Sequence, residues 1–270
     1  MAPATAPLPD PAARRAWAQR GQRFYIVSVV KLPALTIPPV PRPSMSAAKA
    51  IPDLISPHLD RLGAALRRRP APPAGTETAP SPMRSFAPHR LGRFECDAWV
   101  AYYRHDWGRF LASSLGMVHE GFAMAWPATV QGAYLVLRAN QLWAPFPDND
   151  AAGAQQTMTR FYALVADHHH LDLDPATAAD LEIAWWRLHR DLQHDAAGPV
   201  DALTDALAAL YAYVYTVDPL RVRPAAALRA QAMAVSDQWV RQGCDGASAL
   251  LVDELTALVR SYAALRAAVS

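Results

Sequence analysis

Proline is distributed so unevenly along this chain of 270 residues that it divides the sequence into two parts. Seventeen of the 24 prolines lie within residues 1–92. Proline fixes the backbone φ angle and has no N–H to donate, so the run Pro38-Pro39-Val40-Pro41 cannot form a helix or a central strand. The same residues carry 13 Lys and Arg against 4 Asp and Glu. We therefore predict that residues 1–92 are a Pro/Arg-rich leader that does not build a packed core.

The leader has more than one explanation. Met83 stands directly before the rest of the chain and is a second candidate translation start. Arginine outnumbers lysine 24 to 2, as in bacterial genes of high GC content, where upstream reading frames stay open by chance. We expect the leader either to be disordered or to come from a start assigned too early. The alternative role for its arginines, among them Arg67-Arg68-Arg69, is contact with nucleic acid or an anionic membrane.

The remaining residues, 93–270, predict an all-α domain. Apolar residues recur at steps of three and four, and no run alternates with a period of two. Asp150 and Asp174-Pro175 are typical of helix starts, and Gly116 to Gly121 indicates a break. We therefore expect an irregular helical bundle of about seven helices, over residues 93–116, 127–143, 151–167, 174–194, 199–214, 225–242 and 248–269.

Charge and cysteine content exclude several classes of protein. Residues 93–270 hold 13 Lys and Arg against 20 Asp and Glu, which argues against nucleic-acid binding by the bundle. The two cysteines, Cys96 and Cys244, are too few for a disulfide framework or a four-cysteine zinc site. The least charged segment, residues 121–137, is too short to span a membrane. We expect a soluble, cytoplasmic protein, in which the alanine-rich residues 199–270 form either a homo-oligomer contact or a packing cap.

Residues of catalytic type are concentrated in residues 94–195, which contain six of the eight tryptophans and seven of the nine histidines. Within this stretch Glu182 and His189 are seven apart, so both lie on one face of a helix. A carboxylate and an imidazole so placed are candidate catalytic residues, as a base with its orienting group or as metal ligands. The alternative is a histidine at the edge of the core and a glutamate paired with Arg187 or Arg190.

Arg138 is the second candidate, because its neighbours are apolar and its charge persists at physiological pH. A partly buried arginine needs a carboxylate or a bound anion. Glu120, Asp148 and Asp150 are the expected intramolecular partners, and a small anionic ligand is the alternative. The predicted ligand-binding residues are Arg138, Glu120, Trp143, Trp186 and Asp148.

Two further patterns are weaker than they look. His168-His169-His170 lies at a helix end, where consecutive side chains point about 100° apart and cannot share one metal ion. The pairs Asp191/Asp195 and Asp201/Asp205 are spaced like the Mg²⁺-binding aspartates of all-α isoprenoid synthases, but the surrounding residues do not match. The chain also has no glycine-rich phosphate loop and no known hydrolase or zinc-protease signature.

Two functions follow as hypotheses. The first is a helical-bundle binding or interaction module, whose ligand is an unidentified protein partner or a small anion. The second is a metal- or cofactor-dependent enzyme using Glu182, His189 and Arg138, with no particular metal or cofactor indicated. The two hypotheses differ in one structural requirement: the enzyme needs these three side chains to meet in one pocket.

Overall fold

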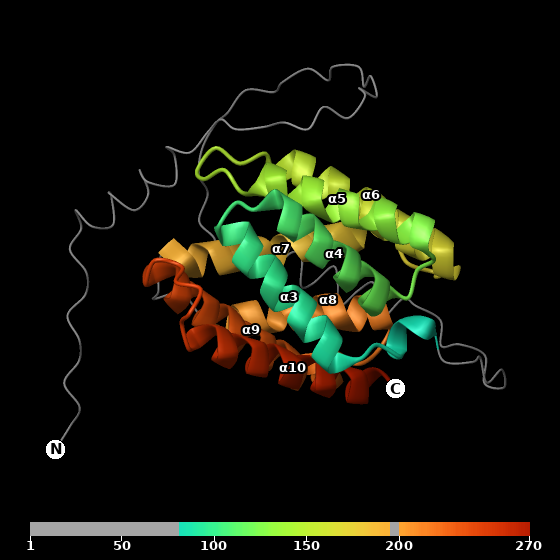
Figure 1. Cartoon of the computed structure of the whole chain (residues 1–270). Coiled ribbons are helices and arrows are strands. Elements are labelled where there is room, and N and C mark those ends of the chain that lie inside the picture. Colours follow the sequence, from blue (N-terminus) through green and yellow to red (C-terminus); the bar gives the residue numbers. More distant parts are fainter. Residues whose placement is uncertain (1–80, 195–199) are drawn as a thin grey trace. The chain divides into compact units, whose positions relative to one another are not determined.

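The computed structural model describes residues 81–194 and 200–270, and the predictions made for residues 1–80 lie outside this part of the chain. The described residues form helices and no strand, which confirms the all-α class (Figure 1). A short 3-10 helix, η1, covers Pro82–Arg84. The eight α-helices that follow are α3 (Pro88–Tyr103), α4 (Trp107–Phe122), α5 (Trp126–Trp143), α6 (Ala151–His169), α7 (Pro175–His194), α8 (Val200–Tyr215), α9 (Pro219–Arg241) and α10 (Leu250–Val269).

The helices pack in the order of the sequence and then close on themselves. Each one packs mainly against the helix before it and the helix after it, and α10 packs against both α9 and α3 (Figure 1). Short connections favour this arrangement, because they place consecutive helices side by side. The result is a closed series of contacts with an interior that every helix can reach.

Local capping explains where several helices begin. The Asp150 carboxylate accepts a hydrogen bond from the Gly153 N–H at 2.8 Å, and that of Asp174 accepts one from the Thr177 N–H at 3.0 Å. Such caps satisfy backbone N–H groups that have no partner within the helix. Both starts that the sequence predicted for α6 and α7 are therefore confirmed.

The first helical segment differs from the prediction in two ways. A single helix over residues 93–116 is wrong, because the chain turns after Tyr103: His105 takes a positive φ of 55°, and Asp106 caps α4. The break predicted around Gly116 to Gly121 falls later, because α4 continues to Phe122 and Ala123 then takes the left-handed conformation. A Cβ atom on Gly116 would lie 2.5 Å from the Phe94 ring. This glycine therefore permits close packing of α3 and α4.

Pro224 is a second place where the prediction fails. The sequence suggested a helix boundary there, but α9 begins at Pro219 and runs through Pro224 to Arg241. A proline inside a helix removes one backbone hydrogen bond. Val222 and Ala225 on either side are buried in the core, so packing holds the helix where the local bond is missing.

The core extends into residues that the sequence analysis assigned to the leader. Met83 and Phe86 are buried and belong to the main apolar cluster. Arg84 donates hydrogen bonds to the backbone carbonyls of Val269 and Tyr215, at 2.5 and 2.6 Å. The packed part of the chain therefore includes residues before 93.

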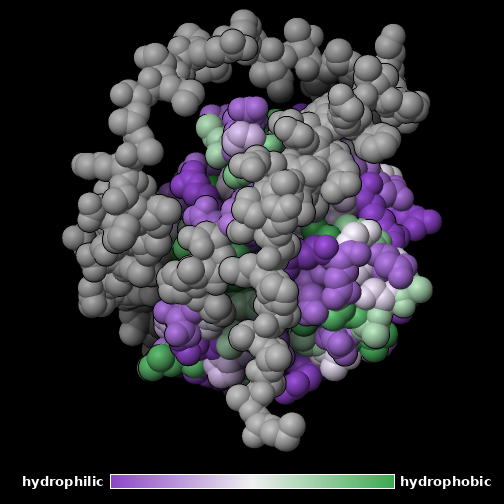
Figure 2. Space-filling model, turned by 90° about the vertical axis from the view of Figure 1, so that its left-hand side faces the viewer, coloured by the Kyte–Doolittle hydropathy of each residue, from purple (hydrophilic) through white to green (hydrophobic). Residues whose placement is uncertain are grey.

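The surface of the described residues is mixed. On the face shown in Figure 2, hydrophilic side chains alternate with smaller hydrophobic groups wherever the surface is not grey. None of the described helices has the length and apolar character needed to cross a membrane.

Candidate functional site

A cavity of about 190 Å³ lies inside the bundle. Every one of the eight helices contributes to its wall, from Glu95 on α3 to Tyr262 on α10. Most of the lining is apolar or aromatic, as in small-molecule sites of known proteins. Its polar and charged lining residues are Glu95, Ser114, Asn140, Tyr162, Glu182, Trp185, Trp186, Tyr211, Tyr215, Arg229 and Tyr262.

One part of the wall is a buried ion pair between α3 and α9. Arg229 donates from Nε and Nη2 to Glu95 Oε1, at 3.0 and 2.5 Å. The other carboxylate oxygen accepts from the Tyr262 hydroxyl at 2.6 Å. Burial alone would lower the pKa of Arg229, but the adjacent Glu95 carboxylate raises it well above its ordinary value. The guanidinium also lies 4.9 Å from the centre of the Trp185 ring, so both charges are fully engaged.

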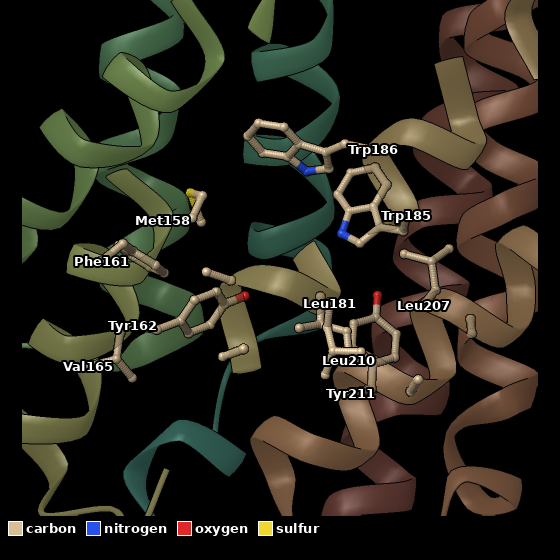
Figure 3. Packing of buried hydrophobic residues seen from close by; sticks show 14 of the residues in the cluster. Met158, Phe161, Tyr162, Val165, Leu181, Trp185, Trp186, Leu207, Leu210 and Tyr211 are labelled. Carbon is tan, nitrogen blue, oxygen red and sulfur yellow. The ribbon is translucent and has the colours of Figure 1, made fainter. Parts of the chain in front are cut away.

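Glu182 on α7 faces the same cavity with different partners. Its carboxylate accepts from the Tyr162 hydroxyl at 2.7 Å and from the Trp186 indole N–H at 3.0 Å. Burial raises the pKa of Glu182, and the nearby Arg229 and the hydrogen bonds oppose that rise. Figure 3 shows Tyr162 and Tyr211 on the two sides of α7, together with Trp185 and Trp186.

Several polar atoms in the wall lack a partner. The Ser114 hydroxyl, the Trp185 indole N–H and the Tyr211 hydroxyl are buried, and none of them has a hydrogen bond of normal geometry among the described residues. All three residues line the cavity. A buried polar group without a partner costs about 1–3 kcal/mol, so its presence calls for an explanation. One explanation is a ligand that supplies the missing hydrogen-bond partners.

A smaller cavity of about 80 Å³ adjoins the first, because Trp99, Phe110, Asn140, Trp185 and Trp186 line both. Six residues line the smaller cavity and not the larger one: Tyr102 and Tyr103 on α3, Trp143 on α5, and His189, Arg190 and Gln193 on α7.

His189 is held in the wall of the smaller cavity by a carboxylate on α9. Its Nε2 lies 3.2 Å from both oxygens of Asp237. Gln193 donates to the same carboxylate at 2.6 Å and contacts the Tyr103 hydroxyl at 2.7 Å. Asp237 therefore orients the imidazole, and the sequence analysis had named no such partner.

The predicted site residues are brought together only in part. Glu182 and Trp186 line the larger cavity, and Trp143 and His189 line the smaller one. Arg138 lines neither. The single pocket containing Arg138, Glu182 and His189 that would have separated the two hypotheses is therefore not formed.

Arg138 and its expected partners lie apart. Its guanidinium donates to Gln141 at 2.5 Å, and no ion pair to it occurs within the described residues. Glu120 instead accepts from the Ala87 backbone N–H at 2.7 Å and pairs with Arg90 at 3.2 Å. Asp148 is exposed, and Asp150 caps α6. The prediction of a carboxylate partner for Arg138 is wrong, because an uncharged amide on the next turn of α5 takes that place.

The histidine run at the end of α6 contacts the turn between α4 and α5. His169 Nε2 lies 2.6 Å from the Phe122 carbonyl oxygen, and the Ala125 backbone N–H donates to His168 Nε2 at 3.3 Å. These contacts hold the turn between α4 and α5. In the part of the chain that the structure describes, no three His, Cys, Asp or Glu side chains are grouped as metal ligands.

The comparisons with known proteins do not add to this picture. The chain matches no protein-family model, no curated protein and no solved structure. Its function has to be inferred from the chemistry of the cavities.

Proposed function

We propose that the protein is a binding module that takes up a small organic molecule in the larger cavity inside the bundle. The observation that carries this proposal is a set of buried polar atoms in the cavity wall, on Ser114, Trp185 and Tyr211, that make no hydrogen bond of normal geometry among the described residues. A mainly apolar cavity with a few convergent polar groups is the usual form of a small-molecule site.

The volume limits the size of the ligand. An engineered, apolar cavity of about 150 Å³ in another protein accommodates benzene. A cavity of about 190 Å³ is therefore suited to a molecule with one ring and a short substituent. Residues of all eight helices from α3 through α10 line it.

Toluene is a suitable first probe, because it tests the apolar body of the ligand alone. We expect toluene to bind the full chain, measured by calorimetry, and to raise its unfolding temperature, since a ligand that binds only the folded state stabilises it. Ala98→Leu and Val136→Phe should each abolish both effects, because both residues line the cavity and the larger side chains occupy it.

Ala263→Leu is the matched control, since Ala263 is exposed on α10. It should bind toluene as the unmodified chain does. If toluene, benzyl alcohol and benzylamine all fail to bind the unmodified chain, or if the two filled variants bind toluene normally, the larger cavity is not a ligand site.

A second candidate function is proton transfer at the smaller cavity, and the contact between His189 and Asp237 favours it. A carboxylate that orients an imidazole is the usual support for a histidine acting as general base. In this proposal the second nitrogen, Nδ1, would be the atom that acts on a molecule in the cavity that His189 lines.

Hydrolysis of p-nitrophenyl acetate tests this second function. His189→Gln and Asp237→Asn should each lower the rate by about 100-fold, the lower end of the usual contribution of a positioned general base. His89→Gln, at an exposed histidine of α3, should leave the rate unchanged. Equal rates in all four proteins would remove the enzyme hypothesis for this site.

A further inference from the structure

The charges that line the larger cavity do not balance. Its wall holds two carboxyl groups, of Glu95 and Glu182, and one guanidinium, of Arg229. The guanidinium is directed to Glu95, with Nη2 2.5 Å from Oε1. Glu182 receives hydrogen bonds only from neutral groups, the Tyr162 hydroxyl and the Trp186 indole. A buried carboxylate needs a positive partner or a proton. In the described wall, Arg229 acts on Glu182 from nearby, but its ion pair is with Glu95.

The surroundings of Glu182 suit a cation better than an anion. Trp99, Phe161 and Trp186 also line the cavity, and an aromatic ring attracts a positive charge to its face. The hydroxyls of Ser114 and Tyr211, neither of which has a hydrogen bond of normal geometry among the described residues, can accept hydrogen bonds from N–H donors. An anion in the cavity would be repelled by the Glu182 carboxylate. Among the described lining residues Arg229 is the guanidinium that could attract it, and Arg229 is already paired with Glu95.

We propose that the ligand is a small organic cation, a protonated amine on an apolar body of about one ring, whose ammonium group pairs with the Glu182 carboxylate. This inference rests on the proposed function and names the ligand class. The apolar body lies among the aromatic and aliphatic side chains of the wall. The remaining N–H groups of the ammonium donate hydrogen bonds to hydroxyl oxygens of the wall.

Burial raises the pKa of Glu182, so the empty cavity holds a neutral carboxylic acid more readily than an exposed glutamate would. Where Glu182 carries a proton in the empty cavity, that proton leaves to solvent when the ammonium enters, and the carboxylate pairs with the ammonium. The total charge inside the cavity then stays the same.

Three probes of nearly equal size test the inference: toluene, benzyl alcohol and benzylamine. They share one ring and differ in the substituent, which is apolar, neutral and polar, or cationic. We expect the unmodified full chain to bind benzylamine at least about tenfold more tightly than benzyl alcohol, because hydrogen bonds between charged groups are roughly twice as strong as neutral ones. This comparison needs no variant, so it does not depend on a substituted protein folding.

Glu182→Gln removes the carboxylate and keeps the shape of the side chain. It should weaken benzylamine binding at least about tenfold and leave toluene binding within about twofold. Asp191→Asn is the matched control, since it removes one negative charge from an exposed position of the same helix, and it should bind all three probes as the unmodified chain does.

The outcomes are distinct. Equal affinities for benzylamine and benzyl alcohol in the unmodified chain, or normal benzylamine binding by Glu182→Gln, would overturn the cation inference and leave the cavity as a site for neutral molecules. Failure of all three probes to bind would overturn the proposed function and this inference with it.

Discussion

Buried carboxyl groups in this molecule have very different surroundings. Glu95 and Glu254 are both fully buried. Glu95 is paired with Arg229 and accepts from Tyr262. Neither oxygen of Glu254 has a hydrogen bond of normal geometry in the described part of the chain. Burial raises the pKa of Glu254 to about 8, with the negative charges of Glu95 and Asp237 adding to the rise. Glu254 is therefore a neutral acid over much of the physiological range.

The raised pKa of Glu254 predicts a pH-dependent stability. The unfolded chain loses the proton near pH 4.5 and the folded chain near pH 8, so the folded state binds more protons between these values. The free energy of unfolding therefore falls as pH rises through this window. Glu254→Gln removes the titration, so the variant should gain on the order of 3 kcal/mol relative to the unmodified chain between pH 4.5 and 8.5.

Urea unfolding at a series of pH values measures this effect. Asp253→Asn, at the exposed residue before Glu254, is the control and should show no comparable gain. A constant difference between Glu254→Gln and the unmodified chain across the whole series would show that Glu254 titrates alike in the folded and unfolded states.

The sequence could identify residues near the site but not their partners. Helical spacing placed Glu182 and Trp186 on an inward face, and both line the larger cavity. The ion pair between Glu95 and Arg229 joins residues 134 apart, and Asp237 is 48 residues from His189. No local pattern reports such contacts. The predicted carboxylate partner of Arg138 was wrong for a different reason. The amide of Gln141, three residues further along the same helix, accepts the hydrogen bond instead.

At the scale of the helices, the sequence predicted where helices begin more reliably than where they are interrupted. Carboxylate caps act within one turn, so the sequence around Asp150 and Asp174 was sufficient. Gly116 and Pro224 read as breaks, but tertiary packing keeps both inside helices. Intrinsic propensity is a weak signal that packing overrides. The boundary between α3 and α4 was missed because their apolar periodicities run on across the turn.

Gly92 gives a test of how α3 closes against α10. A Cβ atom on Gly92 would lie 3.1 Å from both the backbone nitrogen and Cγ2 of Val259, so the two helices approach too closely for a larger residue. Gly92→Leu should destabilise the protein by about 1–3 kcal/mol, the usual cost of overpacking, measured by urea unfolding.

Gly108→Leu is the matched change on an exposed turn of α4, where the nearest atom to an added Cβ is at 3.6 Å. It should change stability by no more than about 0.5 kcal/mol. Equal effects of the two substitutions would contradict close packing of α3 against α10 at Gly92.

At the scale of the whole molecule, the candidate site depends on the packing of the last helix, α10, against α3. Each helix could be expected from its own periodicity, but the contact of α10 with α3 joins the two ends of the described chain. That contact encloses a space to which all eight helices contribute side chains. Sites in helical bundles are commonly built in this way, from residues of facing helices. The cavity is therefore a property of the assembled fold and has no signature in any one segment.

A crystal structure of the full chain saturated with toluene tests the central claim most directly, because it reports where a small apolar molecule goes. We predict an ordered ring inside the larger cavity, in contact with Phe161, Tyr162 and Trp186, with the Glu95–Arg229 pair intact. A structure in which shifted side chains fill this space and toluene is absent from it would contradict the claim that the bundle is built around a ligand site.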